Sequence, residues 1–176
     1  MIPKVYLGGK TGNNDWRQHL VSGLLTQACL GRPIPASNFL YVGPLFLSCT
    51  YGCTYAPSMH GAVTKVGAEA CGTEFDRSEV IGNNLASLDT ADMVFAYITT
   101  TDCHETIQEM SWAAARGKCV VIAFAPNIDP EMFWFLEGQV VATYPGVSQC
   151  CLPHILQIEI ARYQSSACMS RKAGGK

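Results

Sequence analysis

Five apolar runs along the chain read as buried strands, because most positions in each run are hydrophobic. These runs cover residues 4–7, 39–42, 93–98, 119–124 and 139–144. Segments with apolar residues at helical spacing lie between and after them, at 15–29, 77–88, 106–116, 131–137 and 153–163. Continuous apolar strands that alternate with helices are typical of a parallel sheet covered on both faces. The pattern therefore predicts an α/β fold.

The length of 176 residues suits one domain, with a core large enough to fold without disulfides or metals. We expect a single domain over 1–164 and a disordered tail over 165–176, which is small and polar. Residues 43–76 are rich in Gly, Pro, Cys and aromatics and show little periodicity. With the five alternating strands, this gives the expected fold: a flavodoxin-like or Rossmann-like doubly wound sheet of five parallel strands. Residues 43–76 form a long loop insertion after strand 2. Loops that long are usually functional.

The charge pattern excludes two classes of partner. A net charge of −2, with 15% charged residues, favours neither nucleic acid nor an anionic membrane. No apolar run approaches the roughly 18 residues of a membrane span. The first residues lack the basic region and apolar stretch of a signal peptide, so we expect a cytoplasmic protein. Its nine cysteines are then expected to be thiols, most of them buried.

Candidate chemistry gathers in the stretch TTTDCHETIQEM, residues 99–110, which follows the third strand. In an open α/β sheet, ligands bind beyond the carboxyl ends of the strands, so this stretch faces the expected crevice. Thr106 to Glu109 fits the capping box, in which Glu109 only closes the first turn of a helix. Alternatively, Glu109 is held ionised by that first turn and is a nucleophile towards a sugar, with Asp102 as proton donor or anchor for the leaving base. From spacing alone, both interpretations stay open.

Two further groups of residues have alternative interpretations. Gly8 and Gly9 either allow the backbone to approach a ligand or merely end the first strand. They do not form a phosphate-binding loop, because the glycine required five positions before Gly9 is Lys4. Arg17 either holds a phosphate or a base, or is a solvated charge beside a core Trp16.

The long loop contains Cys49, Cys53 and His60, with Cys71 beyond, all of which are potential zinc ligands. Their spacing is looser than that of paired CxxC knuckles. We therefore expect no metal site, although the pattern leaves zinc open. The preferred interpretation is a loop that lines the pocket with aromatic side chains such as Phe46. His60 is then either a ligand contact or a structural residue.

Three segments resemble the nucleoside 2-deoxyribosyltransferase family, especially its shorter bacterial and phage-type members. They are KVYLGG with DWR, GPLFLSCTYGCTYAPSMHG, and ADMVFAYITTTDCHETIQEMSWAAARGK, which together span most of residues 4–124. The last segment is the most specific. It is similar to the family pattern of strand, Asp, Gly-Thr, two residues, Glu, Ile-Gly, small helix residues and Gly-Lys.

The resemblance implies roles for individual residues. Glu109 matches the glutamate that attacks C1′ of the deoxyribose, and Asp102 matches the acidic residue that engages the base. Tyr6 matches a tyrosine whose hydroxyl steers the nucleophile. Asn84 lies near an Asp or Asn that faces the sugar, and Arg77 fits an arginine of the shorter members without a specified role. The other residues expected at the substrate are Gly8, Gly9, Trp16, Arg17, Phe46, His60 and Thr106.

The implied reaction transfers 2-deoxyribose between nucleobases through a covalent glycosyl-glutamate, without metal or organic cofactor. The substrates are a deoxynucleoside or deoxynucleotide and a free base, and a homodimer or larger homo-oligomer is expected because related proteins complete their pockets with a neighbouring subunit. The chain departs from the pattern at Glu105, where the family has Gly, and at Met110-Ser111, where it has Ile-Gly.

Three alternatives stay open. The first is hydrolysis only, by a nucleotide or NAD N-glycosidase, and the second is a catalytically inactive nucleotide-binding sensor, which Glu105 and Ser111 would favour. The third is a flavin-binding protein with a similar sheet. The preferred base and the need for a phosphate also stay open.

Overall fold

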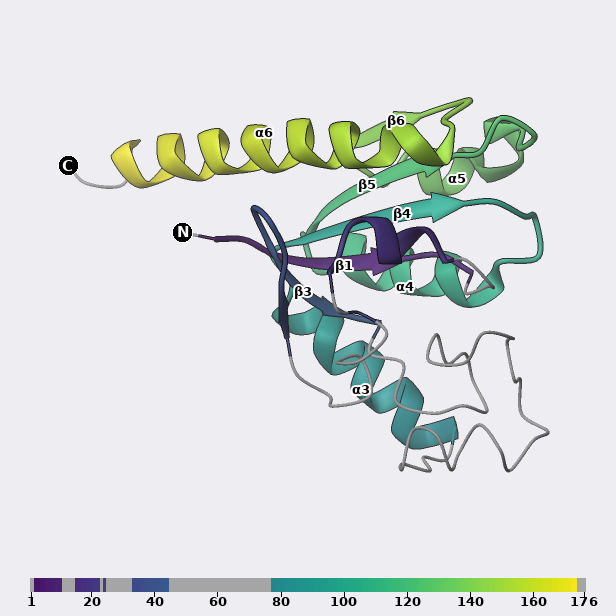
Figure 1. The fold of residues 1–176 in the computed structure, drawn as a ribbon, viewed down its shortest axis with the longest axis horizontal. Coiled ribbons are helices and arrows are strands. Elements are labelled where there is room, and N and C mark those ends of the chain that lie inside the picture. Colours follow the sequence, from purple (N-terminus) through teal and green to yellow (C-terminus); the bar gives the residue numbers. More distant parts are fainter. Residues whose placement is uncertain (1, 11–14, 23, 25–32, 45–76, 174–176) are drawn as a thin grey trace.

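One sheet with helices packed against it forms the centre of the protein (Figure 1). The computed structural model describes residues 2–10, 15–22, 24, 33–44 and 77–173, and the side chains of 77, 79, 80 and 167–173 are outside that description. The strand order is β2-β3-β1-β4-β5-β6. The strands are β1 (Lys4–Gly8), β2 (Ile34–Pro35), β3 (Leu40–Gly43), β4 (Met93–Ile98), β5 (Cys119–Phe124) and β6 (Ala142–Tyr144).

The prediction of an α/β fold with a mostly parallel sheet is confirmed, but the predicted number of strands is wrong. All pairs are parallel except β2 with β3, which is antiparallel. The extra strand β2 has only two residues, too few to leave a pattern in the sequence. Strands β4 and β5 each lie between two other strands and are almost completely buried, which explains their unbroken apolar runs.

Seven helical segments are described. They are η1 (Trp16–His19), α3 (Arg77–Thr90), α4 (His104–Ala115), η4 (Pro130–Phe133), α5 (Trp134–Glu137), η5 (Gln149–Cys151) and α6 (Leu152–Ala173). Helix α6 continues through most of the stretch 165–176 in which we expected a disordered tail. None of the helices within the described ranges is both long and apolar enough to cross a bilayer.

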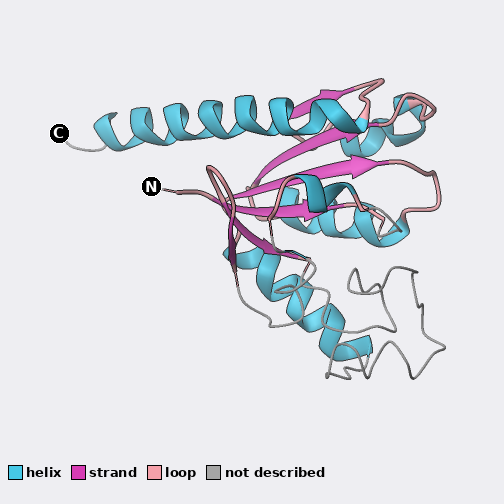
Figure 2. Ribbon diagram, in the orientation of Figure 1, coloured by secondary structure: helices cyan, strands magenta, loops and turns pink. Residues whose placement is uncertain are grey.

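The helices cover both faces of the sheet (Figure 2). Tyr97, Ala123 and Tyr144 are in register across β4, β5 and β6, so their side chains share one face. The Tyr144 hydroxyl contacts Glu159 of α6, which places α6 on that face. Tyr6 of β1 points to the opposite face, where its hydroxyl contacts Glu109 of α4. Helices α3 and α4 pack against each other and against β1 on this second face.

A candidate active site at the carboxyl ends of β1 and β4

Glu109 does not cap its helix. Helix α4 begins at His104, with Cys103 as the N-cap, two residues before the predicted start. Thr106 is therefore a buried residue of the first turn rather than the N-cap, and Glu109 is the sixth helical residue, in the second turn. The capping-box interpretation is thus wrong, because Glu109 lies beyond the unpaired N–H groups of the helix start. Its carboxylate has no local structural explanation.

The Glu109 carboxylate instead reaches the first strand of the sheet. The hydroxyl of Tyr6, which is fully buried in β1, donates a hydrogen bond of 2.5 Å to Oε1 of Glu109. Gly8 lies close beneath α4, since a Cβ added there would lie 2.6 Å from Cε, at the flexible end of the Met110 side chain. The structure therefore gives Gly8 a packing role beneath the helix that carries Glu109.

A second donor comes from α3. Nδ2 of Asn84 lies 3.5 Å from the same oxygen, Oε1 of Glu109. The Oδ1 atom of Asn84 is buried and has no hydrogen-bond partner within the described residues. Three elements, β1, α3 and α4, thus converge on one carboxylate. Both donors lie at Oε1, and no described residue donates to Oε2 of Glu109.

The surroundings of Glu109 raise the pKa of its carboxyl. Burial raises the pKa of its carboxyl from 4.5 to about 7, with a smaller upward contribution from Glu105, while the hydrogen bond from Tyr6 and the charge of Arg17 lower it. The sequence-based expectation that the helix start favours the ionised form is therefore wrong. Burial and the neighbouring Glu109 keep the pKa of the Tyr6 hydroxyl well above its usual value of 10.0, so Tyr6 remains a hydrogen-bond donor.

Asp102 lies at the exposed end of the β4–α4 connection. Nζ of Lys10, which follows β1, lies 2.5 Å from Oδ2 of Asp102. The ammonium of Lys10 is the main reason that the pKa of Asp102 falls from 3.8 to about 2. Asp102 is therefore ionised at neutral pH and accepts hydrogen bonds. Of its two expected roles, the arrangement favours an anchor for the base over a proton donor.

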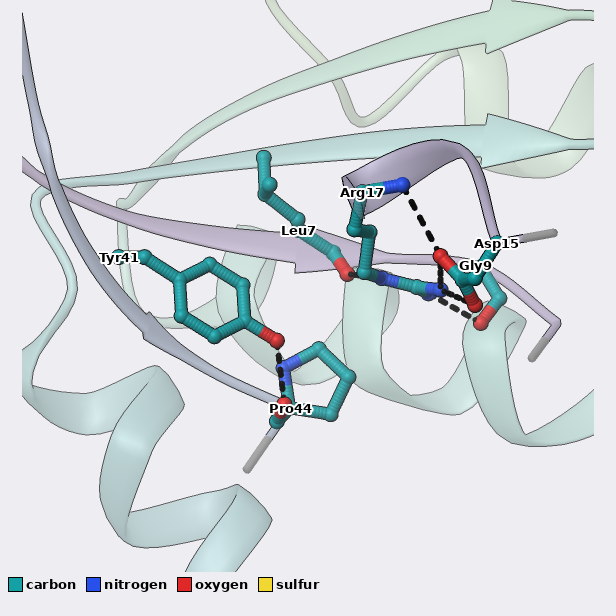
Figure 3. A network of polar contacts seen from close by, with 6 residues as sticks. All are labelled: Leu7, Gly9, Asp15, Arg17, Tyr41 and Pro44. Carbon is teal, nitrogen blue, oxygen red and sulfur yellow. Dashed lines mark hydrogen bonds and ion pairs between the residues drawn. The ribbon is translucent and has the colours of Figure 1, made fainter. Parts of the chain in front are cut away.

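Arg17 is a core residue and not a solvated charge. Figure 3 shows its guanidinium between Asp15 and the end of β1. Both side chains of this ion pair are completely buried, with Nη1 of Arg17 2.7 Å from Oδ2 of Asp15. Nε of Arg17 donates to the carbonyl oxygen of Leu7 at 2.7 Å, and Nη2 donates to that of Gly9 at 2.5 Å. Arg17 thus fixes the backbone that leaves β1 just after Tyr6.

Trp16 and Gly9 belong to the same packed turn. The Trp16 ring is 5% exposed and packs against Phe95 and Tyr97. Gly9 has a φ of 142°, and a Cβ there would lie 2.7 Å from the carbonyl oxygen of Tyr97. This close approach of β1 and β4 requires glycine at position 9.

The Tyr6 ring is held by a residue that sequence reasoning missed. A Cβ added at Gly43, at the end of β3, would lie 2.8 Å from Cε2 of Tyr6 and 3.1 Å from Cβ of Ser87. The backbone of β3 therefore lies directly against the ring. Beyond it, the Tyr41 hydroxyl donates to the carbonyl oxygen of Pro44 (Figure 3). The only signal in the sequence was the Gly-Pro pair after the second apolar run, which we interpreted as the start of a loop.

The sequence did not predict the ion pairs of Lys10 and Asp15. Lys10 pairs with Asp102, 92 positions further along the chain, and Asp15 pairs with Arg17, two positions further. The opposite charges at the carboxyl ends of the first and third apolar runs were the available signal for Lys10 and Asp102.

The remaining expected residues lie at or beyond the limits of the description. Arg77 is the first residue of α3, and its side chain is not described. Phe46 and His60 lie outside the described residues, as do Cys49, Cys53 and Cys71, the other potential zinc ligands. Among the residues that are described, no group of three or more His, Cys, Asp or Glu side chains is arranged to hold a metal.

A separate hollow of about 470 Å³ lies at the opposite end of the central strands. It is lined in part by Asp92 and Cys119, which stand at the amino ends of β4 and β5. The Lys118 ammonium in its wall donates to the carbonyl oxygens of Asp89 and Ala91. This hollow is therefore unrelated to the cluster around Glu109.

The comparisons with known proteins identify a family for most of the chain. A family model described as "Nucleoside 2-deoxyribosyltransferase like" matches residues 2–126. The match includes Tyr6, Asn84, Asp102 and Glu109 and ends shortly after β5. A search among curated proteins gives no match to the chain.

Proposed function

The chain belongs to the nucleoside 2-deoxyribosyltransferase-like family, and we propose that it cleaves the N-glycosidic bond of a deoxynucleoside or deoxynucleotide and transfers the 2-deoxyribose to a second nucleobase. The observation that carries this proposal is the Tyr6–Glu109–Asn84 cluster. The Glu109 carboxylate is partly buried and does not cap its helix. Donors from two other elements orient it through one oxygen. These are the features of a positioned nucleophile.

Glu109 performs the covalent step through its Oε2 atom. Oε2 attacks C1′ of the sugar as the bond to the base breaks, through an oxocarbenium-like transition state, and a glycosyl ester of Glu109 forms. The second base then attacks C1′ from the opposite side and returns the electron pair to Glu109. Two displacements at one carbon give net retention of configuration.

Tyr6 and Asn84 orient the nucleophile. Their hydrogen bonds to Oε1 restrict the orientation of the carboxylate and leave Oε2 without a donor from the described residues. The Tyr6 hydroxyl also favours the ionised form of Glu109, which is the form that attacks. Asp102, held ionised by Lys10, anchors the base by accepting hydrogen bonds from its N–H groups. The chemistry requires neither a metal nor an organic cofactor.

Base exchange tests the proposal directly. The protein is incubated with a panel of deoxynucleosides, deoxynucleotides and NAD, with and without a second free base, and the products are separated by chromatography. Exchange of the base supports transfer, whereas release of the base without exchange supports an N-glycosidase instead. Binding of these ligands without any turnover would overturn the proposal in favour of a sensor.

The matched variants identify the nucleophile. Glu109→Gln keeps the shape and the acceptor oxygen for Tyr6 but cannot form the ester, so it should abolish turnover. Glu131→Gln, at an exposed position of η4, should leave turnover unchanged. Near-normal turnover by Glu109→Gln would refute the assignment.

We also propose that the protein is a homodimer or a larger homo-oligomer. Four large apolar side chains after β5 are each more than 60% exposed, a common feature of interaction surfaces. They are Met132, Trp134, Phe135 and Val141. Light scattering on the eluate of a size-exclusion column measures the state, and a monomer at micromolar concentration would contradict the proposal.

A further inference from the structure

Two exposed thiols lie side by side in η5, just before α6. Sγ of Cys150 is 4.0 Å from Sγ of Cys151, and both side chains are exposed. Of the other two cysteines whose side chains are described, Cys103 is buried and Cys119 is half-buried. Free cysteine is among the residue types most often buried in proteins. Packing in the core therefore explains Cys103 and does not explain the exposed pair.

We propose that Cys150 and Cys151 form a binding site for a soft monovalent metal ion, Cu(I), which both sulfurs coordinate. On binding, two S–Cu bonds form and each thiol loses its proton to solvent, so Cu(I) and two thiols give a Cu(I) dithiolate and two protons. No oxidant or reductant takes part. The inference is independent of the proposed function, because neither thiol belongs to the Tyr6–Glu109–Asn84 cluster.

The distance between the two sulfurs is the first argument. Bonds from a metal ion to thiolate sulfur are roughly 2.3 Å long. Two such bonds from one ion to sulfurs 4.0 Å apart enclose an angle of about 120°. This is the angle of trigonal coordination, so the two thiols can bind one ion at their present separation.

The anchored backbone around the pair is the second argument. Before the pair, the Tyr97 hydroxyl donates to the carbonyl oxygen of Val147 at 2.9 Å, and the N–H of Val147 donates to that of Phe124 at 2.7 Å. After the pair, Leu152 is buried in the core. The segment that carries the thiols is thus held on both sides, and ligands held in place lose little conformational freedom when they bind an ion.

A disulfide between the two residues is the main alternative, and the backbone disfavours it. The Cα atoms of adjacent residues are roughly 3.8 Å apart across a trans peptide, whereas those of disulfides are usually roughly 4.4–6.8 Å apart. Closing a bond between Cys150 and Cys151 would therefore distort η5. A metal ion bridges the two sulfurs without bringing them closer.

The donor set selects the metal. Thiolates are soft ligands, which favour Cu(I) and zinc over hard cations such as Mg²⁺ and Ca²⁺. Zinc sites usually contain at least three protein ligands, and the described side chains include no group of three His, Cys, Asp or Glu arranged to hold a metal. Cu(I) is stable with two or three soft ligands. The two thiolates and one small thiol from solution therefore complete its coordination.

Competition with bicinchoninate, which forms a coloured complex with Cu(I), tests the site in the absence of oxygen. The measured quantity is the number of Cu(I) equivalents that the full chain withholds from this chelator. Loss of one member of a bivalent pair lowers affinity by roughly 10² to 10⁴-fold. Cys150→Ser and Cys151→Ser should therefore each withhold one equivalent fewer than the wild type. The double variant should lose the same single equivalent, because one thiol alone is insufficient.

Cys119→Ser is the matched control. It removes one half-buried thiol from the same chain and should leave the number of equivalents unchanged. The proposal is overturned if either single variant of the pair keeps the wild-type number, or if the double variant loses two equivalents. It is also overturned if Cys119→Ser lowers the number as much as the other variants do, since binding would then follow only the count of thiols.

Phenylarsine oxide tests the proximity of the two sulfurs directly. Its arsenic bonds to two thiols with release of one water, so a bridged pair gains one phenylarsenic group and loses two hydrogens. After digestion with trypsin, mass spectrometry should find this group on the peptide 119–162, and Cys119→Ser should leave it there. Absence of the bridged adduct from this peptide would overturn the proposal, because the two sulfurs would then not converge on one atom.

Discussion

Replacement of the nucleophile should stabilise the protein at alkaline pH. Burial raises the pKa of Glu109 from 4.5 to about 7, so the ionised carboxylate is less stable in the folded protein than in the unfolded chain. At 1.36 kcal/mol per pKa unit, this shift of about 2.5 units corresponds to about 3 kcal/mol of unfolding free energy. Gln resembles the protonated carboxyl, keeps an acceptor for Tyr6 and never ionises, so Glu109→Gln should recover this energy.

The sign of the effect follows from proton binding. Between pH 4.5 and about 7, the folded protein retains a proton on Glu109 that the unfolded chain has lost. The contribution of Glu109 to the unfolding free energy therefore falls as the pH rises through this interval, and is constant above it. The advantage of Glu109→Gln should be under about 1 kcal/mol at pH 5 and about 3 kcal/mol at pH 8.

Urea unfolding at pH 5 and pH 8 measures this difference, with Glu131→Gln as the control for loss of a surface carboxylate. In thermal unfolding at pH 8, about 3 kcal/mol corresponds to a rise in Tm of roughly 6–12 °C for a protein of this size. The reasoning would be refuted if Glu109→Gln were no more stable than the wild type at pH 8. It would also be refuted if the gain in unfolding free energy were as large at pH 5 as at pH 8. The carboxylate would then be solvated rather than buried beneath α3 and β1.

Three further variants test the support of the nucleophile. Tyr6→Phe removes a hydrogen bond to a charged group, so kcat should fall roughly tenfold to a hundredfold. The acid limb of the pH profile of kcat/KM should also move to higher pH, because the Glu109 carboxylate loses a stabilising donor. An unchanged pH profile would contradict this. Gly43→Ala should displace the Tyr6 ring and lower both kcat and the urea midpoint, since the added Cβ lies 2.8 Å from Cε2. Arg17→Met should lower the unfolding free energy by about 3–5 kcal/mol by leaving Asp15 buried and unpaired, and Asp15→Leu in the same chain should recover much of the loss.

The elements that the sequence predicts well are those buried on both sides. β4 and β5 are apolar at almost every position because they contact helices on one face and η1 or α6 on the other, so hydrophobicity alone reveals them. The start of α4 was mispredicted because Thr106 and Glu109 have the spacing of a capping box. In the structure Thr106 is buried in the first turn and the helix begins at His104, so packing outweighs the local preference.

The candidate site divides in the same way. Topology placed Asp102 and Glu109 at the carboxyl ends of the strands, because the connection after a parallel strand always emerges there. The contact between Tyr6 and Glu109 joins positions 103 residues apart, and no local pattern reports such a distance. The direction of the Glu109 pKa shift could not be predicted either, since it depends mainly on burial of the side chain in the folded protein. For Arg17 the sequence left open a ligand contact and a solvated charge, and neither interpretation included the buried pair with Asp15, because Asp15 becomes a partner only when both side chains are buried.

The arrangement around Glu109 reconciles two opposing requirements. A nucleophile must be ionised to attack C1′, yet the packing that excludes water and fixes its direction favours the protonated acid. Tyr6 and Arg17 act against this tendency, the first by a hydrogen bond and the second by its charge. Arg17 also holds the carbonyl groups of Leu7 and Gly9, so one buried cation supports both the charge of the nucleophile and the strand that presents Tyr6. Stability and reactivity are therefore coupled through β1, and a change to Arg17 should alter both together.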